Sequence, residues 1–182
     1  ADAELNPREL QDGDNRIDLT YLMRLGYGAI RQTGRPDIGL ILGRQTGITR
    51  FGHAGLAAMT APTLGDALEI ITRYEPLHGR CYRGSSQLTR NGQQTQLEFY
   101  SIAPYNDYTY FVVDAVLGGW YQIIQWMTGR TDLVAHALIE FSTPSYYQAY
   151  DATFPCGVRF HQEINGLVLK PGALATPLLH SN

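Results

Sequence analysis

The side chains that could carry catalysis are scattered along this chain. Five histidines occur with no HxH or HExxH spacing that would place two imidazoles on one metal ion, at His53, His78, His136, His161 and His180. The two cysteines, Cys81 and Cys156, are far apart and neither belongs to a CxxC pair. We therefore predict no metal site and no cofactor, and we expect both thiols to be reduced and buried.

The motifs of the common enzyme classes are also missing. The sequence has no GxSxG elbow, no GxxxxGK[ST] loop and no GxGxxG after an expected strand. Serine hydrolase, nucleotide hydrolase and dinucleotide-binding chemistry therefore lack their signatures. A Cys–His pair that forms only in the folded chain stays open, because such partners need not be close in sequence. We predict that the protein is not an enzyme.

Asp114 is the most informative single residue. It stands between Val113 and Ala115 in a nearly all-apolar stretch, where an unpaired buried carboxylate would be costly. Three explanations remain: Asp114 faces solvent, it pairs with an arginine such as Arg80 or Arg83, or it holds a polar group of a ligand.

Helical spacing predicts a possible pocket around Asp114. Tyr110, Leu117 and Tyr121 fall on its face of the expected helix. The predicted ligand site comprises Tyr110, Asp114, Tyr121, Arg80 and Arg83. A contact with Asp114 would favour a cationic or polyhydroxylated ligand, whereas an aromatic-walled pocket without that contact would suit an apolar one.

The element that carries Asp114 is an expected helix over residues 106–129. Its length favours a helix over a strand, its apolar residues cover most of its circumference, and Asn106 or Asp107 can cap it. Gly118 and Gly119 inside it indicate close packing of another backbone or a kink. We expect this to be the central buried helix.

Further helices are predicted at 18–34, 36–45 and 63–74, with a short one started by Pro144 over 144–154. The helix after Thr63 has the clearest start, because Thr63 and Asp66 form a capping-box pattern. Its apolar stripe consists of Leu64, Ala67, Leu68, Ile71 and Tyr74. We expect this helix to be scaffold.

Strands are predicted from runs rich in Tyr, Thr and Gln. Residues 80–90 and 94–102 flank Asn91-Gly92, a strong hairpin signal. A strand is expected at 136–142, and a second hairpin at 157–162 and 166–170. Helices and strand pairs without a strict βαβ rhythm predict an α+β fold with an antiparallel sheet built from hairpins, in one domain spanning 1–182.

Charge excludes some partners. Fourteen basic against 17 acidic residues give a net charge of −3, a poor basis for holding phosphates. We expect this chain alone not to bind DNA well. The sequence shows no run of about 18 apolar residues and no charged-then-apolar leader, so neither a membrane span nor secretion is predicted, and we expect a cytoplasmic protein.

Two stretches resemble the N-terminal regulatory domain of AraC-type transcription regulators, the subgroup often labelled arabinose-binding. The first, residues 35–74, carries the family's glycine-rich pattern at Gly39, Leu40, Gly43, Gly52, Gly55, Thr63, Leu64, Ala67, Leu68, Arg73 and Tyr74. The second, residues 141–174, carries its closing pattern at Pro144, Tyr147, Tyr150, Phe154, Val158, Phe160, Asn165, Leu167 and Leu174. The likeness extends from about Leu5 to Leu179.

The resemblance implies a sensor and dimerisation domain that binds a small-molecule effector and controls an attached DNA-binding domain. The family continues into two helix-turn-helix units that these 182 residues do not contain, so DNA would be met only through that missing part. The alternative is a dimerisation module without an effector, whose aromatic surface is an interface. Other AraC-type sensors are jelly-roll-like barrels, which need more strands than are found here.

Overall fold

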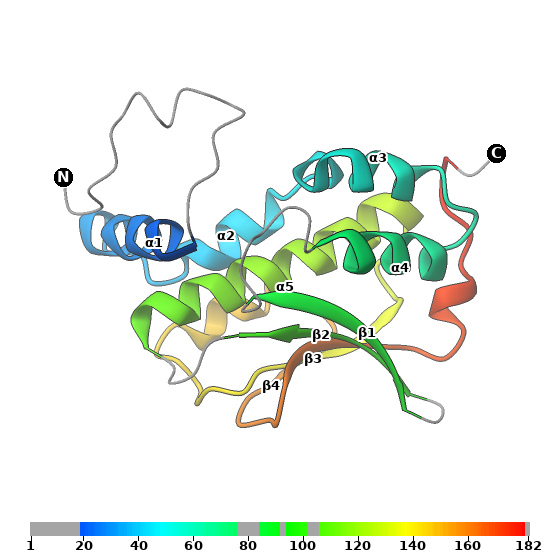
Figure 1. Cartoon of the computed structure of the whole chain (residues 1–182). Helices are drawn as coiled ribbons and strands as arrows, with labels where there is room; N and C mark the ends of the chain where they lie inside the picture. Colours follow the sequence, from blue (N-terminus) through cyan, green and yellow to red (C-terminus); the bar gives the residue numbers. More distant parts are fainter. Residues whose placement is uncertain (1–18, 76–83, 92–93, 102–105, 181–182) are drawn as a thin grey trace.

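The computed structural model describes residues 19–75, 84–91, 94–101 and 106–180. Figure 1 shows a curved sheet with the long helix α5 (Asp107–Thr128) lying across one of its faces. Helices α1 (Leu19–Thr33) and α2 (Ile38–Arg44) pack on α5. Helix α4 (Leu64–Tyr74) lies against β1 beside α5, and α3 (Gly52–Met59) packs on α4. The α+β prediction is confirmed.

Helix α5 begins and ends where the sequence predicts. The Asn106 backbone N–H donates to Thr109 Oγ1 at 2.8 Å, and the Thr109 N–H donates to Asn106 Oδ1 at 3.3 Å. This reciprocal cap satisfies N–H groups that have no partner within the helix. Gly129 has φ +67° and donates its N–H to the Gln125 carbonyl at 2.7 Å, which ends the helix.

The glycine pair in α5 allows α2 to approach closely. A Cβ atom on Gly43 would lie 2.9 Å from the Gly118 Cα atom, and one on Gly119 would lie 3.1 Å from Thr46 Oγ1. The predicted close backbone packing is confirmed. It fixes α2 against the face of α5 that carries Asp114, since a Cβ atom on Gly39 would lie 2.9 Å from Asp114 Cβ.

The other helices follow local signals to different degrees. Helix α1 ends at Gly34, which has φ +66°, as predicted. In α4 the Asp66 N–H donates to Thr63 Oγ1 at 3.3 Å, so the predicted cap is confirmed, although Tyr74 is 45% exposed rather than part of the buried stripe. Helix α3 was not predicted, because its inward face consists of small residues with little apolar periodicity.

Within the described ranges the sheet has five strands, in the order β1-β2-β5-β3-β4. Strands β1 (Ser85–Asn91) and β2 (Gln94–Tyr100) pair antiparallel, as the Asn91-Gly92 signal predicts. Strand β5 (Asn165–Leu169) pairs antiparallel with both β2 and β3 (Val134–Leu138). The short β4 (Val158–Arg159) pairs with β3 in parallel.

The predicted second hairpin is therefore wrong. All five residues of β5 are buried, so this strand gains more from neighbours on both sides in the sheet centre than from a hairpin at an edge. Between β4 and β5, His161 adopts φ +58° and its N–H donates to the Phe141 carbonyl at 3.2 Å, which turns the chain away from β4.

Only part of the predicted helix over 144–154 forms. A 3-10 turn, η3 (Tyr147–Tyr150), is followed by further turns in which the Thr153 and Phe154 N–H groups both donate to the Tyr150 carbonyl, at 2.9 and 2.7 Å. We refer to residues 144–156 as the bridging segment, because it runs between the two features described next.

Candidate functional site

A buried carboxylate lies where α5 meets the bridging segment. Asp114 has no exposed surface. The Tyr146 hydroxyl donates to its Oδ2 atom at 2.7 Å, and the Tyr150 hydroxyl donates to its Oδ1 atom. Both carboxylate oxygens therefore have a partner, and the first of the three explanations for Asp114, a solvent-facing carboxylate, is wrong.

Burial dominates the electrostatics of this cluster. Loss of water around Asp114 raises the pKa of its carboxyl group to about 7, against the hydrogen bonds from Tyr150 and Tyr146, which lower it, while the nearby Asp37 charge raises it further. Burial also raises the pKa of both phenols, and the Asp114 charge adds to that effect. The tyrosines are thus held as neutral donors to an acid that titrates near neutral pH.

A ladder of aromatic rings continues from this cluster. The ring centroids of Tyr146 and Tyr150 are 5.8 Å apart, and those of Tyr150 and Phe154 are 6.2 Å apart, both pairs being stacked. Phe154 then meets Tyr121 of α5 edge-on at 5.6 Å. The ladder joins Asp114 to Tyr121 through side chains of the bridging segment.

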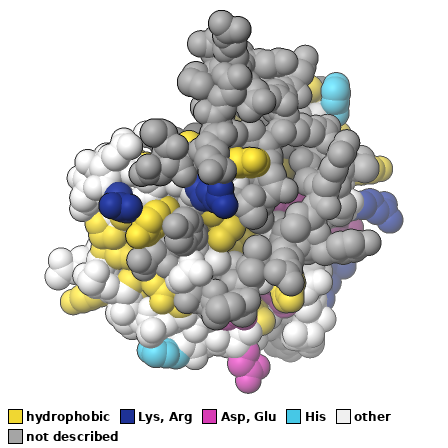
Figure 2. Space-filling model, turned by 60° about the vertical axis from the view of Figure 1, so that its left-hand side comes forward, with side chains coloured by type: hydrophobic (Ala, Val, Ile, Leu, Met, Phe, Trp, Pro, Cys, Tyr) yellow, Lys and Arg dark blue, Asp and Glu magenta, His cyan; other side chains and the backbone are white. Residues whose placement is uncertain are grey.

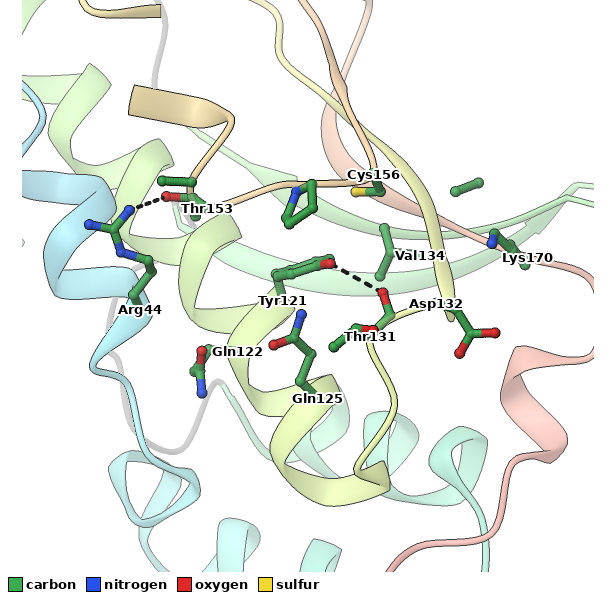
Figure 3. A pocket seen from close by; sticks show the side chains of 13 residues that line it. Arg44, Tyr121, Gln122, Gln125, Thr131, Asp132, Val134, Thr153, Cys156 and Lys170 are labelled. Carbon is green, nitrogen blue, oxygen red and sulfur yellow. Dashed lines mark hydrogen bonds between the residues drawn. The ribbon is translucent and has the colours of Figure 1, made fainter. Parts of the chain in front are cut away.

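Tyr121 forms part of the wall of an open cleft of about 560 Å³. Figure 3 shows that α5 provides one side of the cleft through Tyr121, Gln122 and Gln125, while Thr153 and Cys156 approach from the bridging segment. The volume lies in the range of small-molecule sites. Polar groups from several elements thus converge on one hollow.

Two hydrogen bonds connect elements that form the cleft. The Arg44 guanidinium, on the last residue of α2, donates to Thr153 Oγ1 at 3.1 Å. The Tyr121 hydroxyl donates to the Thr131 carbonyl at 3.3 Å, after α5 has ended (Figure 3). Burial raises the pKa of the Tyr121 phenol, and the neighbouring Cys156 thiol acts in the same direction. The Tyr121 phenol is therefore an uncharged group in the wall of the cleft.

Charged side chains occupy the rim. Lys170 follows β5 and holds its place through an N–H···O bond of 2.9 Å to the Leu133 carbonyl. Asp132 receives two hydrogen bonds from Arg130, at 2.9 and 2.7 Å, and this pairing lowers the pKa of its carboxyl group. In the described part of the chain, Arg44 and Lys170 form no ion pair, although Asp37 lies close enough to Arg44, and Asp132 close enough to Lys170, to interact electrostatically.

The sequence-predicted site residues lie in three places. Tyr121 is on the cleft, Asp114 is beneath the bridging segment, and Tyr110 is half-buried with its ring stacked on Phe141 at 4.2 Å between centroids. The aromatic ladder connects the first two. Arg80 and Arg83 lie outside the described residues, and so does Cys81.

Sequence reasoning missed most of the cleft. Arg44, Lys170 and Thr153 come from three segments far apart in the chain, and each alone is typical of a solvated position. One signal was available: the spacing of Tyr146, Tyr150 and Phe154 in the bridging segment places aromatic rings at four-residue intervals. Cys156, which we expected to be buried, is a half-buried free thiol at the cleft.

The described residues show neither a metal-binding cluster nor a membrane-spanning helix. Within them, no group of three or more His, Cys, Asp or Glu side chains is arranged to hold a metal ion. None of the helices in these ranges has the length and apolarity that crossing a lipid bilayer requires.

The sequence and the fold resemble those of known proteins. Residues 1–178 match the family described as "Arabinose-binding domain of AraC transcription regulator, N-term". The ornithine utilization regulator of Pseudomonas aeruginosa is 21% identical over 180 residues, which is 99% of this chain and 52% of that protein.

A crystal structure of the transcriptional regulator CdpR from the same species superposes with a TM-score of 0.66 at 20% identity, over 86% of this chain and 50% of that one. At this identity the likeness concerns the fold. The chain thus spans about half the length of the two regulators it resembles. Because the family match covers nearly every residue, this chain belongs to the arabinose-binding N-terminal domain family of AraC transcription regulators.

Proposed function

We propose that this domain binds a small-molecule effector in the cleft and controls the DNA binding of an attached C-terminal domain. The observation that carries the proposal is the convergence of Arg44, Tyr121, Gln125, Thr153 and Lys170 on one hollow of about 560 Å³. Such a concave site with a few placed polar groups is typical of small-molecule binding. The two regulators that resemble the chain support a role in transcription, not in catalysis. A regulator of transcription acts where the bacterial chromosome lies, so we expect a cytoplasmic protein.

The bridging segment would couple the cleft to the rest of the domain. It touches the cleft at Thr153 and Cys156 and holds the Asp114 carboxylate through Tyr146 and Tyr150. An effector that binds one arrangement of this segment more tightly than another would shift the population between them, as any transmitted signal requires.

The predicted site residues then have different roles in the proposal. Tyr121 contacts the effector directly, while Asp114 acts on it through the bridging segment. Tyr110 supports that arrangement from the preceding turn of α5, through its stacking on Phe141. Arg80 and Arg83 stay predicted ligand residues.

Thermal unfolding of the 182-residue chain tests effector binding. The panel contains amino acids, polyamines, sugars and fatty acids, with ornithine included because a similar regulator is named for ornithine utilization. A compound at about 100 times its dissociation constant should stabilise the fold by roughly 2.7 kcal/mol. Gln125→Ala should weaken that response, whereas Gln87→Ala on β1, outside the cleft, should not. If no compound shifts the unfolding temperature, this domain is not an effector sensor.

Self-association is the second part of the proposal. Figure 2 shows hydrophobic side chains gathered around two basic ones on the side of the molecule that lies to the left in Figure 1, where α1 is found. On α1, the apolar side chains of Tyr21, Met23, Leu25, Tyr27 and Ile30 are only half-buried. Exposed apolar surface of this kind supports an interface between two copies.

Sedimentation equilibrium over a range of concentrations tests that part. A dimer whose stability ignores every compound in the panel would favour the alternative, an effector-independent dimerisation module. A monomer at all concentrations would remove self-association from the proposal and leave effector binding intact.

A further inference from the structure

The cleft carries more positive than negative charge on its described lining. Arg44 and Lys170 stand at its rim without an ion-pair partner in the described ranges. The one acidic side chain there, Asp132, already has both oxygens bound to Arg130, at 2.9 and 2.7 Å. A ligand that enters therefore meets two cations that form no ion pair, beside a carboxylate that is hydrogen-bonded to Arg130 and interacts more weakly with Lys170.

Arg44 is held ready for a planar acceptor. It is half-buried, and its Nη1 atom is tied to the Thr153 hydroxyl at 3.1 Å, a neutral group that leaves other N–H donors of the guanidinium available. A guanidinium fixed in this way matches the two oxygens of a carboxylate.

The kind of anion is narrowed by the helix that bears Arg44. Arg44 is the last residue of α2, so the helix presents its carbonyl end, which carries a partial negative charge, toward the cleft. That polarity opposes any anion, and it opposes a doubly charged phosphate more strongly than a singly charged carboxylate. A singly charged carboxylate suits the site better.

The rest of the ligand must make hydrogen bonds. Gln122 and Gln125 lie on α5 between the two cations in Figure 3, and both are half-buried, so their amides can donate to and accept from a polar body. Tyr121 is the one aromatic residue of the described lining, and it is only 4% exposed, so it offers little apolar surface. This lining does not suit a long apolar chain.

We infer that the cleft recognises a small organic acid, a carboxylate on a polar or hydroxylated body, with the carboxylate on Arg44 and the polar body extending toward Lys170 at the other end of the cleft. This inference rests on the proposed sensor function and names the class of its effector. It goes beyond the Asp114 site, where a contact would have favoured a cationic or polyhydroxylated ligand.

Pairs of compounds that differ by one carboxylate provide the test. Ornithine is compared with putrescine, and gluconate with glucose, by calorimetric titration into the wild-type chain, with inorganic phosphate as a separate arm. We expect the carboxylate member of at least one pair to bind roughly ten to a hundred times more tightly than its partner, the ratio that a hydrogen-bonded charge supplies.

Four variants locate the effect. Arg44→Gln should weaken the carboxylate member about tenfold or more and reduce the ratio within the pair. Lys170→Gln should weaken it less, because Lys170 meets the polar body at the other end of the cleft, and Lys170→Arg should retain binding. Arg130→Gln releases the Asp132 charge into the cleft and should also weaken the carboxylate. Arg90→Gln is the matched control, because Arg90 pairs with Glu69 of α4 and does not line the cleft. It should not change the affinity for any compound. Thermal unfolding without ligand shows that each variant is folded.

The outcomes separate the two proposals. Putrescine or glucose could bind at least as tightly as the corresponding acid, with an affinity that Arg44→Gln and Lys170→Gln leave unchanged. That result would overturn the carboxylate inference and leave the sensor function standing. Phosphate binding that outcompetes every carboxylate would overturn the choice of anion. A wild-type chain that binds no compound at all would overturn the sensor function, and the inference with it.

Discussion

The Tyr150 hydroxyl donates a hydrogen bond to Asp114 Oδ1, joining the bridging segment to the middle of α5 across 36 positions of sequence. Tyr146 bonds the other oxygen. This one carboxylate therefore fixes both tyrosines, and through them the start of the aromatic ladder that reaches the cleft at Tyr121. The chemistry of Asp114 should be measurable in the stability of the whole domain.

Asp114→Asn should remove a pH dependence of stability. The folded state raises the pKa of Asp114 from 3.8 to about 7, so between those values the native protein holds a proton that the unfolded chain releases. The free energy of unfolding of the wild type should therefore fall, relative to that of Asp114→Asn, as pH rises from about 4 to about 7. One pKa unit corresponds to about 1.4 kcal/mol, which sets an upper limit of about 4 kcal/mol on this difference.

Urea unfolding at half-unit steps of pH measures the effect. Glu163→Gln, at an exposed position, is the control for a change in charge alone. Parallel stability curves for wild type and Asp114→Asn would show that the buried carboxyl does not titrate in this range.

Tyr150→Phe should cost more at high pH than at low pH. Above pH 7 it leaves a buried carboxylate with one fewer donor, and a hydrogen bond to a charged group contributes about 1.5–3 kcal/mol. Near pH 5 the acid is protonated and the loss should be closer to about 1 kcal/mol. Chemical unfolding at the two pH values compares them, with Tyr147→Phe on the exposed side of the same turn as the matched control. A cost that is equal at both pH values would contradict this account of the Asp114 cluster.

Gly43→Ala and Gly28→Ala should change stability in opposite directions. A Cβ atom on Gly43 would meet the Gly118 backbone at 2.9 Å, so α2 must move away from α5, at a cost of roughly 1–3 kcal/mol. A Cβ atom on Gly28 of α1 has nothing within 4 Å, so alanine there should stabilise the helix by about 0.5–1 kcal/mol. Thermal unfolding of the two variants tests the pair. A neutral Gly43→Ala would mean that the α2–α5 contact relaxes freely.

Effector binding should slow amide exchange in the bridging segment. The N–H groups of Thr153 and Phe154 bond to the Tyr150 carbonyl, and Thr153 lines the cleft, so a bound compound should restrict the opening that exposes them. Hydrogen exchange with the most stabilising compound of the panel should show about tenfold or stronger protection at these amides, with the Gly34 amide at the end of α1 unchanged. Protection confined to α5 would show that the compound binds at the cleft but does not restrict the bridging segment.

Local signals were enough to predict the elements but not their neighbours. The cap at Asn106, the Thr63–Asp66 pattern and the Asn91-Gly92 turn all act within a few residues, and each gave the right element. Strand β5 was misplaced because a hairpin with the nearby β4 satisfies the same local pattern. Its actual neighbours, β2 and β3, are chosen by burial of a strand that is apolar throughout, which no local pattern encodes.

The site was predictable only where it lies on a single helix. Asp114 stands out because its charge contrasts with the apolar face of α5, and Tyr121 stands out because it extends that face. Arg44 and Lys170 follow the ends of two separate elements, and only the packing of α2 on α5 and of β5 in the sheet centre brings them to one cleft. Long-range packing thus decides which side chains line the cleft.

The position of β5 in the sheet also constrains how the domain can fold while the ribosome synthesises it. Of the five strands it is synthesised last, yet it lies third in the sheet, between β2 and β3. A nascent chain can close the β1–β2 hairpin early, but it holds two separate sheet fragments until residues 165–169 leave the exit tunnel. Until then β2 and β3 each present an open edge, the kind of surface that pairs with other chains. Translation pauses before residue 165 should therefore lower the yield of native protein more than pauses after it.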